Sequence, residues 1–494
     1  MIKNTIKMGM LAAVVALSGC DSFLDINTSP NSPSEDLLTT SDIFPGAEIA
    51  VCTSYSGTMR MLGGYYAEQY GGVPGNSNYN SNSQFSVGTG SANGFWYNLY
   101  VKGLNNLYTV IKKAEAEGDK GTKLAAVVMR ALAYASLVDA VGEVPYTEAN
   151  DVQNYPMPHF DDGKVVYEGI LAELEEAVKD VAPSDLVCKN FLFSDGRAEG
   201  WIKTANALRL RVLFRMSNVE NVQAKIAALI AENNFPTSDV AWAGFWTDAN
   251  EKCNPFFRGY GDASYSYTKK NISLNLSVVK TMEAADDPRM GGVMQKNNEG
   301  KYFGGLSGNT LADADGITAN TMSLPSVKFD SPAYIITVAE VEFFLAEYEA
   351  RYGSAAAAAD HYKAAIEASC QTYGVDYSPT NLNAYPLDAA NWKKCIGIQK
   401  WVHLSGTDNY EAWCELRRLG YPAFGSVSGA DLFNGGELDF DLYVPGTLYT
   451  PYTVSATVGD NKILQRFPYP SDAAARNSNT PANKGDLVPV FWAE

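Results

Sequence analysis

The sequence predicts a mostly α-helical protein with long, irregular insertions that are rich in aromatic residues. Two observations predict this fold class. In several long segments apolar residues recur at steps of three and four, which is the period of an amphipathic helix. Between these segments lie stretches dense in glycine, asparagine and tyrosine, where no such period occurs and turns are expected.

Length and composition agree with a large globular protein. Of the 494 residues, 46% are hydrophobic and 19% are charged, so the chain has enough apolar material for a core and is not disordered. About 150 residues per domain would allow roughly three domains, but one large helical domain over residues 41–494 also fits, and we predict it. The 38 basic and 56 acidic residues give a net charge of −18, which argues against nucleic-acid binding.

The first twenty residues predict export. Lys3 and Lys7 precede a short apolar run that ends in Leu17-Ser18-Gly19-Cys20. Small residues before a cleavage site are typical of secretory signals, and a cysteine directly after Leu-Ser-Gly resembles a bacterial lipobox. We predict that residues 1–19 are a signal peptide and that Cys20 is lipidated; the alternative is an ordinary signal peptide with a chance cysteine. Elsewhere no run of 18 apolar residues occurs, so lipid would be the only membrane attachment.

Residues 20–40 are rich in serine, asparagine, aspartate, proline and threonine, and we expect a lipid-anchored flexible tether. A helical pattern then runs from Ser41 to Leu62, and the stretch from Gly63 to Gly94 is predicted to be non-helical. Further helices are predicted at Phe95–Ala116, Lys123–Val141, Gly163–Val181, Glu199–Ser217, 218–232, Pro332–Tyr352, Ser354–Tyr373 and Asn391–Leu419, the last interrupted near Ser405-Gly406.

Glycine and proline mark the ends of two of these helices. One stops at Gly142 with Pro145 three residues beyond, and another stops at Gly420 with Pro422 two residues later. Loops and short elements are expected from Phe235 to Gly308, and irregular structure over residues 421–494.

One helix pair has a pattern similar to a tetratricopeptide repeat. With Gly353 as the turn, small and aromatic residues fall where that repeat places them: Ala346, Ala358, Tyr362 and Ala365. Small residues let two antiparallel helices approach closely, and the tyrosine fills the groove between them. Other helix pairs are consistent with the same stacking but do not match the consensus.

Motifs for catalysis are missing from the sequence. It contains no H-E-x-x-H, no G-x-S-x-G and no phosphate-binding loop. A glycosidase needs only two carboxylates at a suitable separation, so the sequence does not exclude one. The acidic residues of one helix, however, are most simply interpreted as solvated or capping charges: Glu340, Glu342, Glu347 and Glu349.

Metal and cofactor sites are not predicted either. Asp313-Ala314-Asp315-Gly316 resembles the start of a calcium loop, but no glutamate follows at the twelfth position, so we expect an ordinary turn. Six cysteines besides Cys20 are not arranged as C-x-x-C, and we expect buried, unpaired thiols, although export would permit disulfides. They are Cys52, Cys188, Cys253, Cys370, Cys395 and Cys414.

The aromatic insertions indicate sugar binding. Sugars present flat C–H faces that stack on Trp and Tyr, while their hydroxyls bind amides and charged groups. Residues 76–84 with 93–98, and residues 242–267, combine these residue types on loops, where burying backbone would leave polar groups unpaired. We therefore expect a ligand platform where the two insertions converge, with four candidate contacts: Tyr79, Trp96, Trp246 and Tyr265. The alternative is that many of these rings belong to the core, since Trp96 and Tyr100 lie one helical turn apart.

Short blocks along the whole mature chain resemble the SusD/RagB family of outer-membrane nutrient-binding lipoproteins, in its SusD-like branch. The mature start is Cys20-Asp21-Ser22-Phe23-Leu24-Asp25-Ile26-Asn27. In the family's order, the other blocks are Gly142–Ala149, Trp201–Arg215, Asp287-Pro288-Arg289-Met290, Ala339–Glu347, Gln399-Lys400-Trp401, Glu411-Ala412-Trp413, Arg417–Pro422 and Arg466–Pro470.

The resemblance implies a SusD-like fold with four tetratricopeptide-like helix pairs and no catalysed reaction. It implies that the protein lies in the outer membrane, facing the cell exterior, as a lid on a TonB-dependent SusC-like barrel transporter. It also implies that the ligand is an oligosaccharide or, in some members, a peptide. The matching blocks define the scaffold, and Arg417-Arg418, for example, is expected to be a cationic last turn that favours the helix dipole. They carry no binding site over to this chain.

The sequence thus favours a surface glycan-binding lipoprotein that hands oligosaccharide to a transporter. Two other hypotheses stay open at this point. An exported glycan hydrolase or lyase would show turnover and a carboxylate pair at a pocket, and a peptide-binding or scaffold lipoprotein would have no affinity for sugars.

Overall fold

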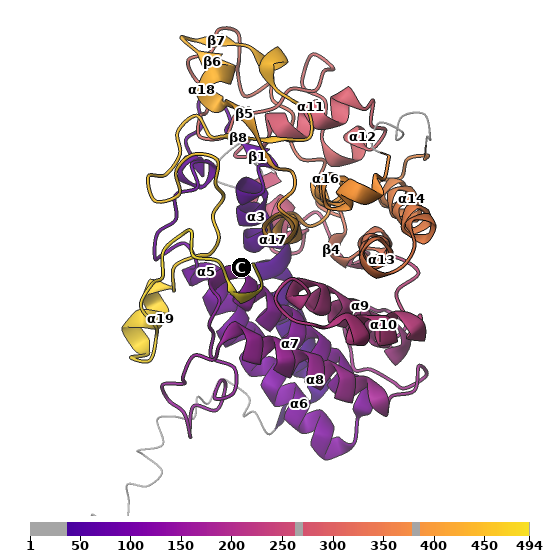
Figure 1. Ribbon diagram of the computed structural model, residues 1–494. Helices are drawn as coiled ribbons and strands as arrows, with labels where there is room; N and C mark the ends of the chain where they lie inside the picture. Colours follow the sequence, from indigo (N-terminus) through magenta and orange to yellow (C-terminus); the bar gives the residue numbers. More distant parts are fainter. Residues whose placement is uncertain (1–36, 262–269, 378–385, 494) are drawn as a thin grey trace, which may run out of the picture.

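The computed structural model describes residues 37–261, 270–377 and 386–493. Helices make up the lower and right-hand parts of the molecule, and loops with short two-stranded sheets lie above and to the left (Figure 1). The first helices are α2 (Thr40–Thr53), the π-helical segment η2 (Ser54–Met59), α3 (Arg60–Tyr66), α4 (Asn80–Ser83), α5 (Asn93–Tyr97), the π-helical segment η3 (Asn98–Leu104), α6 (Asn105–Glu117), α7 (Lys120–Val141), α8 (Gly163–Lys179), α9 (Ala198–Met216) and α10 (Gln223–Glu232).

The second half of the chain begins with short elements and then adds a further group of helices. These elements are η4 (Phe257–Gly261), α11 (Leu276–Ala284), α12 (Met290–Val293), α13 (Val338–Tyr352), α14 (Ala355–Thr372), η5 (Ala389–Asn391), α16 (Trp392–Leu404), α17 (Asn409–Leu419), α18 (Gly429–Leu432), η6 (Phe440–Leu442), α19 (Ser471–Arg476) and η7 (Phe491–Ala493). The break between α16 and α17 falls at the predicted interruption. The mostly α fold class and the long helices are confirmed, with ends that differ by a few residues.

Strands contribute only small pairs to the described structure. Three pairs are antiparallel: β1 (Tyr70–Gly71) with β3 (Ser273–Leu274), β2 (Val240–Trp242) with β4 (Ala333–Ile336), and β6 (Phe433–Asn434) with β7 (Glu437–Leu438). The pair of β5 (Phe424–Ser428) and β8 (Leu448–Thr450) is parallel. The prediction that a helix starts at Pro332 was wrong, because residues Ala333–Ile336 form β4 and α13 begins only at Val338. The extended chain ends at Thr337, whose hydroxyl accepts a hydrogen bond from the Glu340 amide and so caps α13.

The prediction that no helix lies between Gly63 and Gly94 was wrong. α3 continues through Gly63 and Gly64 to Tyr66 because the glycines allow it to pack closely on α17. A Cβ on Gly63 would lie 2.5 Å from the Asn409 carbonyl oxygen and from the Tyr410 Cα. Glycine at this position therefore marks a close helix contact rather than a turn.

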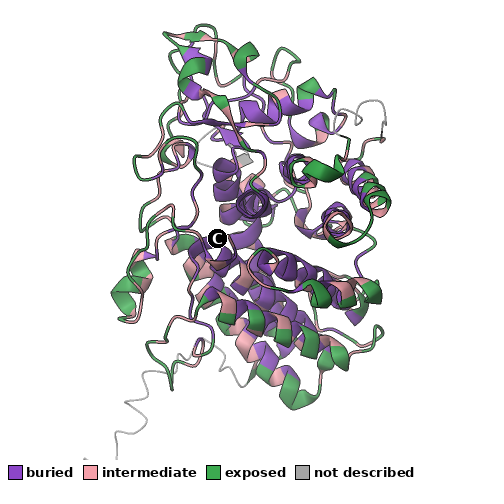
Figure 2. Ribbon diagram, in the orientation of Figure 1, coloured by how far each residue is buried: buried purple, intermediate pink, exposed green. Residues whose placement is uncertain are grey.

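Aromatic residues of the predicted insertions build much of the core. Tyr66, Tyr70, Phe85, Trp242 and Phe256 are fully buried, and the buried zone runs through the centre of the molecule along α3, α7, α9 and α17 (Figure 2). The expectation that such loop aromatics stay out of the core was wrong for these rings. Their polar atoms find partners inside: the Trp242 indole N–H donates to Glu48 at 3.0 Å, and the Tyr70 hydroxyl donates to Asn409 at 2.7 Å.

α13 and α14 form the helix pair with the repeat-like pattern. Ala346, Ala358, Tyr362 and Ala365 are all buried. The Tyr362 ring lies edge-on to Phe343 of the facing helix, with 6.2 Å between ring centroids. The placement agrees with the close contact that the pattern predicts, whereas the number of tetratricopeptide-like pairs stays a prediction.

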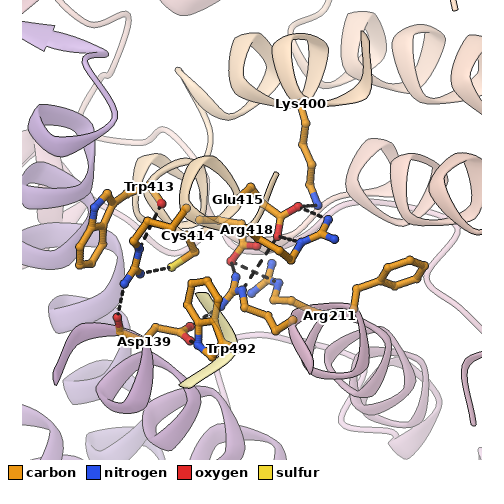
Figure 3. Close-up of polar contacts among 12 residues, drawn as sticks. Asp139, Arg211, Lys400, Trp413, Cys414, Glu415, Arg418 and Trp492 are labelled. Atoms are coloured by element: carbon orange, nitrogen blue, oxygen red, sulfur yellow. Dashed lines mark hydrogen bonds and ion pairs between the residues drawn. The ribbon is translucent and has the colours of Figure 1, made fainter. Parts of the chain in front are cut away.

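A network of buried ion pairs joins α7, α9, α13, α16 and α17 (Figure 3). Its ion pairs are Arg211–Glu340 (2.8 Å), Arg418–Glu347 (2.6 Å), Arg418–Glu415 (2.6 Å), Lys400–Glu415 (2.9 Å), and Arg215 with both Asp139 and Glu411. Burial opposes ionisation of Glu415, but Arg418 and Lys400 hold its pKa below the ordinary range. The interpretation of Glu340 and Glu347 as solvated or capping charges was therefore wrong, because their carboxylates neutralise buried arginines.

The C-terminal segment closes this network. The Trp492 indole N–H donates to Asp139 Oδ1 at 2.9 Å, and the Arg417 guanidinium lies 3.5 Å from the centre of the Trp413 ring. Arg417 and Arg418 are therefore buried partners of other elements, not only a cationic last turn of α17. Trp492 near the C-terminus thus belongs to the same hydrophobic core as Phe44 of α2, the first described helix.

Six thiols are unpaired in the structure, as expected, and four of them are buried, while Cys188 and Cys395 are half-buried. Of the described helices, α7 alone is long and apolar enough to cross a membrane, and most of its residues are buried between α6, α8 and α9. Because its residues are buried by neighbouring helices, α7 is a core helix of this protein. Cys20 and most of the predicted tether lie outside the described residues.

Candidate functional site

An open groove of about 260 Å³ lies between α5 with η3, the loop that follows Pro145, and α19; the labels of α5 and α19 are on the left of Figure 1. Residues 93–101 form one wall and residues 145–160 the second, while residues 472–477 close the third side. Aromatic, amide and charged side chains line the groove together: Asn93, Trp96, Tyr97, Tyr100, Asn150, Phe160, Asp472, Arg476 and Asn477.

Stacked rings support the groove from the core side. Trp96 contacts Tyr100 and Phe160, with ring centroids 4.6 Å and 6.0 Å apart, and the Phe160 ring lies nearly parallel to it. The Tyr100 hydroxyl donates to the Pro145 carbonyl at 2.7 Å, which ties the first wall to the second. Contacts of this kind hold each ring in one orientation.

The outer part of the groove exposes apolar surface. Tyr97 keeps 49% of its surface exposed and Val101 50%, and Tyr155 and Met157 of the second wall are similarly open. Soluble proteins seldom leave several large apolar side chains together in solvent unless the surface binds something. The groove therefore continues outward into a surface fit for a flat, partly apolar ligand.

Amide side chains fasten the second wall to the third. The Asn477 amide donates to the Pro158 carbonyl at 2.8 Å, and the Asn479 amide donates to the Met157 carbonyl at 2.7 Å. The Asn93 amide donates to Ser471 at 3.0 Å, so the first wall is joined to α19 as well. A groove whose three walls are cross-linked in this way loses little conformational entropy when it binds.

Carboxylates around the groove are already engaged. Glu148 accepts from the His159 ring at 2.9 Å, and the Asp161 carboxylate accepts from the backbone amides of Tyr146 and Thr147. Burial opposes ionisation of Glu143, but hydrogen bonds from Lys484, Tyr469 and Arg466 lower its pKa to about 2. The charged groups that line the groove itself, Asp472 and Arg476, are both exposed.

The structure separates the four predicted contact residues. Trp96 lines the groove. Tyr79 lies elsewhere, between Tyr65 and Tyr260 at centroid distances of 6.4 Å and 5.6 Å, and burial raises its pKa to about 12. Trp246 is half-buried against Phe245, and its indole N–H donates to the Trp242 carbonyl at 3.0 Å. Tyr265 lies outside the described residues.

The two insertions do meet, but not at the groove. Tyr79 of the first contacts Tyr260 of the second, and the Asn76 amide donates at 2.8 Å to Asn271, four residues beyond the second. Trp96 and Trp246, in contrast, have no contact partner in common. The structure therefore supports Trp96 as part of the groove, and it places Tyr79 and Trp246 in two other aromatic clusters.

Sequence reasoning missed the second and third walls. Phe160 and Arg476 are about 60 and 380 residues from Trp96 in the chain, and no spacing rule connects them. The one available signal is the run Tyr155-Pro156-Met157-Pro158-His159-Phe160, in which aromatic residues, as in the insertions, stand on a segment that its prolines keep non-helical. Tyr97 was part of the aromatic block around Trp96 but was not singled out.

Metal ligation has no support in the described residues, in which no three His, Cys, Asp or Glu side chains cluster as a metal would require. The segment from Asp313 to Gly316 contains a turn, with Gly316 at a φ of 71°.

A family model described as SusD-like, starch-binding and associating with the outer membrane matches residues 53–438. The chain belongs to the SusD-like family. The resemblance given by the short sequence blocks is thus confirmed. The matched region includes the first two walls of the groove and ends before α19.

Solved structures share the SusD-like fold over nearly their full length. A chitin-binding protein is 22% identical with a TM-score of 0.71, over 91% of this chain and 99% of the other. A SusD homologue from Bacteroides uniformis is 20% identical with a TM-score of 0.70, over 91% and 98%. A second homologue, from Bacteroides fragilis, is 18% identical with a TM-score of 0.67, over 92% and 99%. No curated protein matches by sequence. At such identities these likenesses show the fold alone.

Proposed function

We propose that this protein is a cell-surface lipoprotein that binds glycans and delivers them to a TonB-dependent SusC-like transporter, without catalysing a reaction. The observation that carries glycan binding is the groove beside Trp96, where aromatic rings, amides and charged groups line one open hollow. Membership of a family described as starch-binding supports the same ligand class.

Size and openness suit part of a sugar chain. Pockets that enclose a whole small ligand usually measure about 300–1,000 Å³, and this groove, at about 260 Å³, is slightly smaller and open at the outer side. One or two rings would fit inside, with their C–H faces on Tyr97 and Trp96 and their hydroxyls on the exposed Asp472 and Arg476. The rest of the chain would continue over the exposed apolar rim.

A hydrolase is the second candidate, and the groove does not favour it. Glycoside hydrolases commonly use two carboxyl groups on either side of the scissile bond, about 5–9.5 Å apart. Among the residues that line the groove, Asp472 supplies the single carboxylate, and the neighbouring Glu148 and Asp161 are held by hydrogen bonds. Binding without turnover therefore agrees best with this surface.

The binding test is calorimetry on a panel of oligosaccharides with wild-type protein, Trp96→Ala and Trp246→Ala. Each stacked ring contributes on the order of 1 kcal/mol, by analogy with aromatic pairs. We expect Trp96→Ala to weaken binding about five- to tenfold at that value, with little change in melting temperature. Trp246→Ala, which lies outside the groove, serves as the control. Unchanged affinity in Trp96→Ala would remove Trp96 from the site, and affinity for peptides alone would favour the scaffold or peptide-binding alternative.

The anchor and the transporter partner need separate tests. Cys20→Ser should abolish lipidation and leave the protein unanchored or unprocessed, and a wild-type protein without an acyl mass on Cys20 would contradict the anchor. A lid should bury well over ~1,200 Å² against the barrel, so it should copurify with a large β-barrel after mild detergent extraction. Recovery only as a monomer from cells that also express a SusC-like barrel, encoded next to this protein, would count against the partnership.

A further inference from the structure

Two cations at the groove have no carboxylate partner among the described residues. Arg476 lines the groove on α19 and is exposed. Lys102 directly follows the first wall; its ammonium lies 5.5 Å from the centre of the Tyr97 ring, and its side chain is exposed too. Some other exposed lysines of the described chain face a glutamate, such as Lys179 with Glu176 at 3.1 Å.

Carboxylates near these cations are held elsewhere, as the pairing of Glu148 with His159 and of Glu143 with Lys484 shows. Asp472, one turn before Arg476 on α19, is the exception: its carboxylate lines the groove without a described partner. The charges without a described ion-pair partner are thus Arg476 and Asp472 in the groove lining and Lys102 at its edge, on a chain whose net charge is −18.

We propose that the groove selects oligosaccharides that carry an acidic group, a uronic-acid carboxylate or a sulfate, and that Arg476 binds this group. The inference rests on the proposed glycan binding and adds the class of sugar. A guanidinium presents parallel N–H donors that match two oxygens of a carboxylate or sulfate. Lys102 adds a second positive charge beside the stacking ring of Tyr97.

Because the protein as a whole is acidic, preference for an acidic sugar must come from cations close to the bound group. A strongly acidic protein repels anionic sugars at most of its surface, so attraction must come from cations within about one Debye length, roughly 8 Å at physiological salt. Asp472 would oppose the acidic ligand and accept hydrogen bonds from sugar hydroxyls instead. Removing Asp472 and removing Arg476 therefore have opposite effects on an acidic ligand.

The test measures calorimetric affinities for matched pairs of oligosaccharides: oligogalacturonate with its neutral methyl ester, and a sulfated chondroitin oligosaccharide with its desulfated form. The proteins are wild type, Arg476→Gln, Lys102→Gln and Asp472→Asn, with Lys363→Gln as a control on α14, far from the groove. All four substituted positions are exposed, so thermal melting should show the variants as well folded as the wild type.

We expect wild-type protein to bind one acidic form about tenfold more tightly than its neutral partner, as a charge-assisted hydrogen bond would allow. Arg476→Gln should lose most of that preference, Lys102→Gln about two- to threefold, and Asp472→Asn should gain about twofold. Affinity for the neutral forms should change little, and raised salt should weaken only the acidic ones. The chondroitin and galacturonate pairs distinguish sulfate from carboxylate.

Equal affinity for acidic and neutral forms, with both weakened by Tyr97→Ala, would overturn the acidic selectivity and leave glycan binding intact. Binding of acidic forms that Arg476→Gln does not weaken would overturn the role of Arg476. Failure of every oligosaccharide to bind would overturn the proposed function together with this inference.

Discussion

Arginines and aromatic rings occur together in two regions of this protein, and their states differ. In the buried network each arginine meets carboxylates: Arg418 contacts Glu347 and Glu415, both at 2.6 Å. In the groove Arg476 is exposed and has no described carboxylate partner. The rings differ in the same way, because Trp413 and Trp492 are buried while Tyr97 is half exposed.

The difference follows from the cost of removing a charge from water. A buried ion without a partner costs several kcal/mol, so the core holds its arginines either on carboxylates or, as with Arg417, on backbone carbonyl oxygens. A surface arginine is solvated and needs no partner. An unpaired cation beside open aromatic rings is therefore available to a ligand, whereas the paired cations of the core are available only to the fold.

Breaking one buried pair should have the largest effect. Arg418→Met leaves Glu347 and Glu415 without their bidentate partner, and we expect a loss of about 3–5 kcal/mol in unfolding free energy. Chemical denaturation measures it. The matched control is Lys203→Met, which removes an exposed pair with Glu199 and should cost less than about 0.5 kcal/mol. Similar losses in both variants would contradict the division between core and surface charge.

Trp242 and Trp246, both in the second insertion, allow a buried ring to be compared with a half-buried one. Trp242→Ala removes a fully buried ring and its hydrogen bond to Glu48, and should destabilise the protein by about 3–5 kcal/mol. Trp246→Ala removes a half-buried ring and should cost about 1 kcal/mol. Thermal and denaturant unfolding of the two variants, side by side, gives the comparison. A larger loss for Trp246 would show that its ring, not that of Trp242, anchors the insertion.

Asp408, a buried carboxyl group beside the ion-pair network, predicts that the stability of the fold depends on pH. Burial raises the pKa of Asp408 to about 7 from an ordinary value of 3.8, although its carboxylate caps α17 and accepts from Tyr55. A carboxyl group with a raised pKa binds its proton more tightly in the folded state. Its contribution is therefore favourable at low pH and is lost as the pH rises from about 4 to 7, by on the order of 2–4 kcal/mol.

Asp408→Asn keeps an oxygen for the cap and removes this titration. Relative to wild type, the variant should gain stability between pH 4 and pH 7 and show no further gain above that range. Asp431→Asn is the control, because hydrogen bonds from Ser428 lower the pKa of that exposed carboxylate. Urea unfolding at several pH values measures the difference, and parallel curves for Asp408→Asn and wild type would show that Asp408 ionises normally in the fold.

Loosening the groove should have the smallest effect. Asn479→Ala removes the hydrogen bond between its amide and the Met157 carbonyl, which joins two walls. Stability should fall by about 1 kcal/mol or less, and oligosaccharide affinity about two- to threefold, because the walls are less well preorganised. Asn218→Ala, which breaks a similar amide contact to Arg418 away from the groove, should affect stability only. Equal losses of affinity in both variants would argue against a rigid groove.

Much of the helical fold was predictable from the sequence, and the groove was not. The helix period fixed α7 and α14 to within a few residues, because an amphipathic or buried helix repeats its apolar residues along the chain. The same local patterns misassigned Gly63 and Trp242. Glycine at a close helix contact resembles glycine in a turn, and a loop tryptophan whose indole reaches Glu48 resembles an exposed one.

Contacts that are distant in sequence account for the rest. Trp96 was selected because its neighbours have the composition of a sugar site, but its groove also needs Phe160 and Arg476. Nothing local in the sequence indicates that α19 returns to α5, since the Asn93–Ser471 hydrogen bond joins residues 378 positions apart. The pairing of Glu347 with Arg418 also joins distant parts of the chain. The sequence therefore could not show which arginines are buried in ion pairs and which, like Arg476, stay exposed.

Sugar binding should take place in the groove between α5, residues 145–160 and α19. A crystal structure of the protein with an oligosaccharide identified by calorimetry tests it most directly. We predict sugar rings against Tyr97 and Trp96, with an acidic substituent within hydrogen-bond distance of Arg476. An empty groove with the sugar bound at the Tyr79–Tyr260 cluster or beside Trp246 would contradict the account.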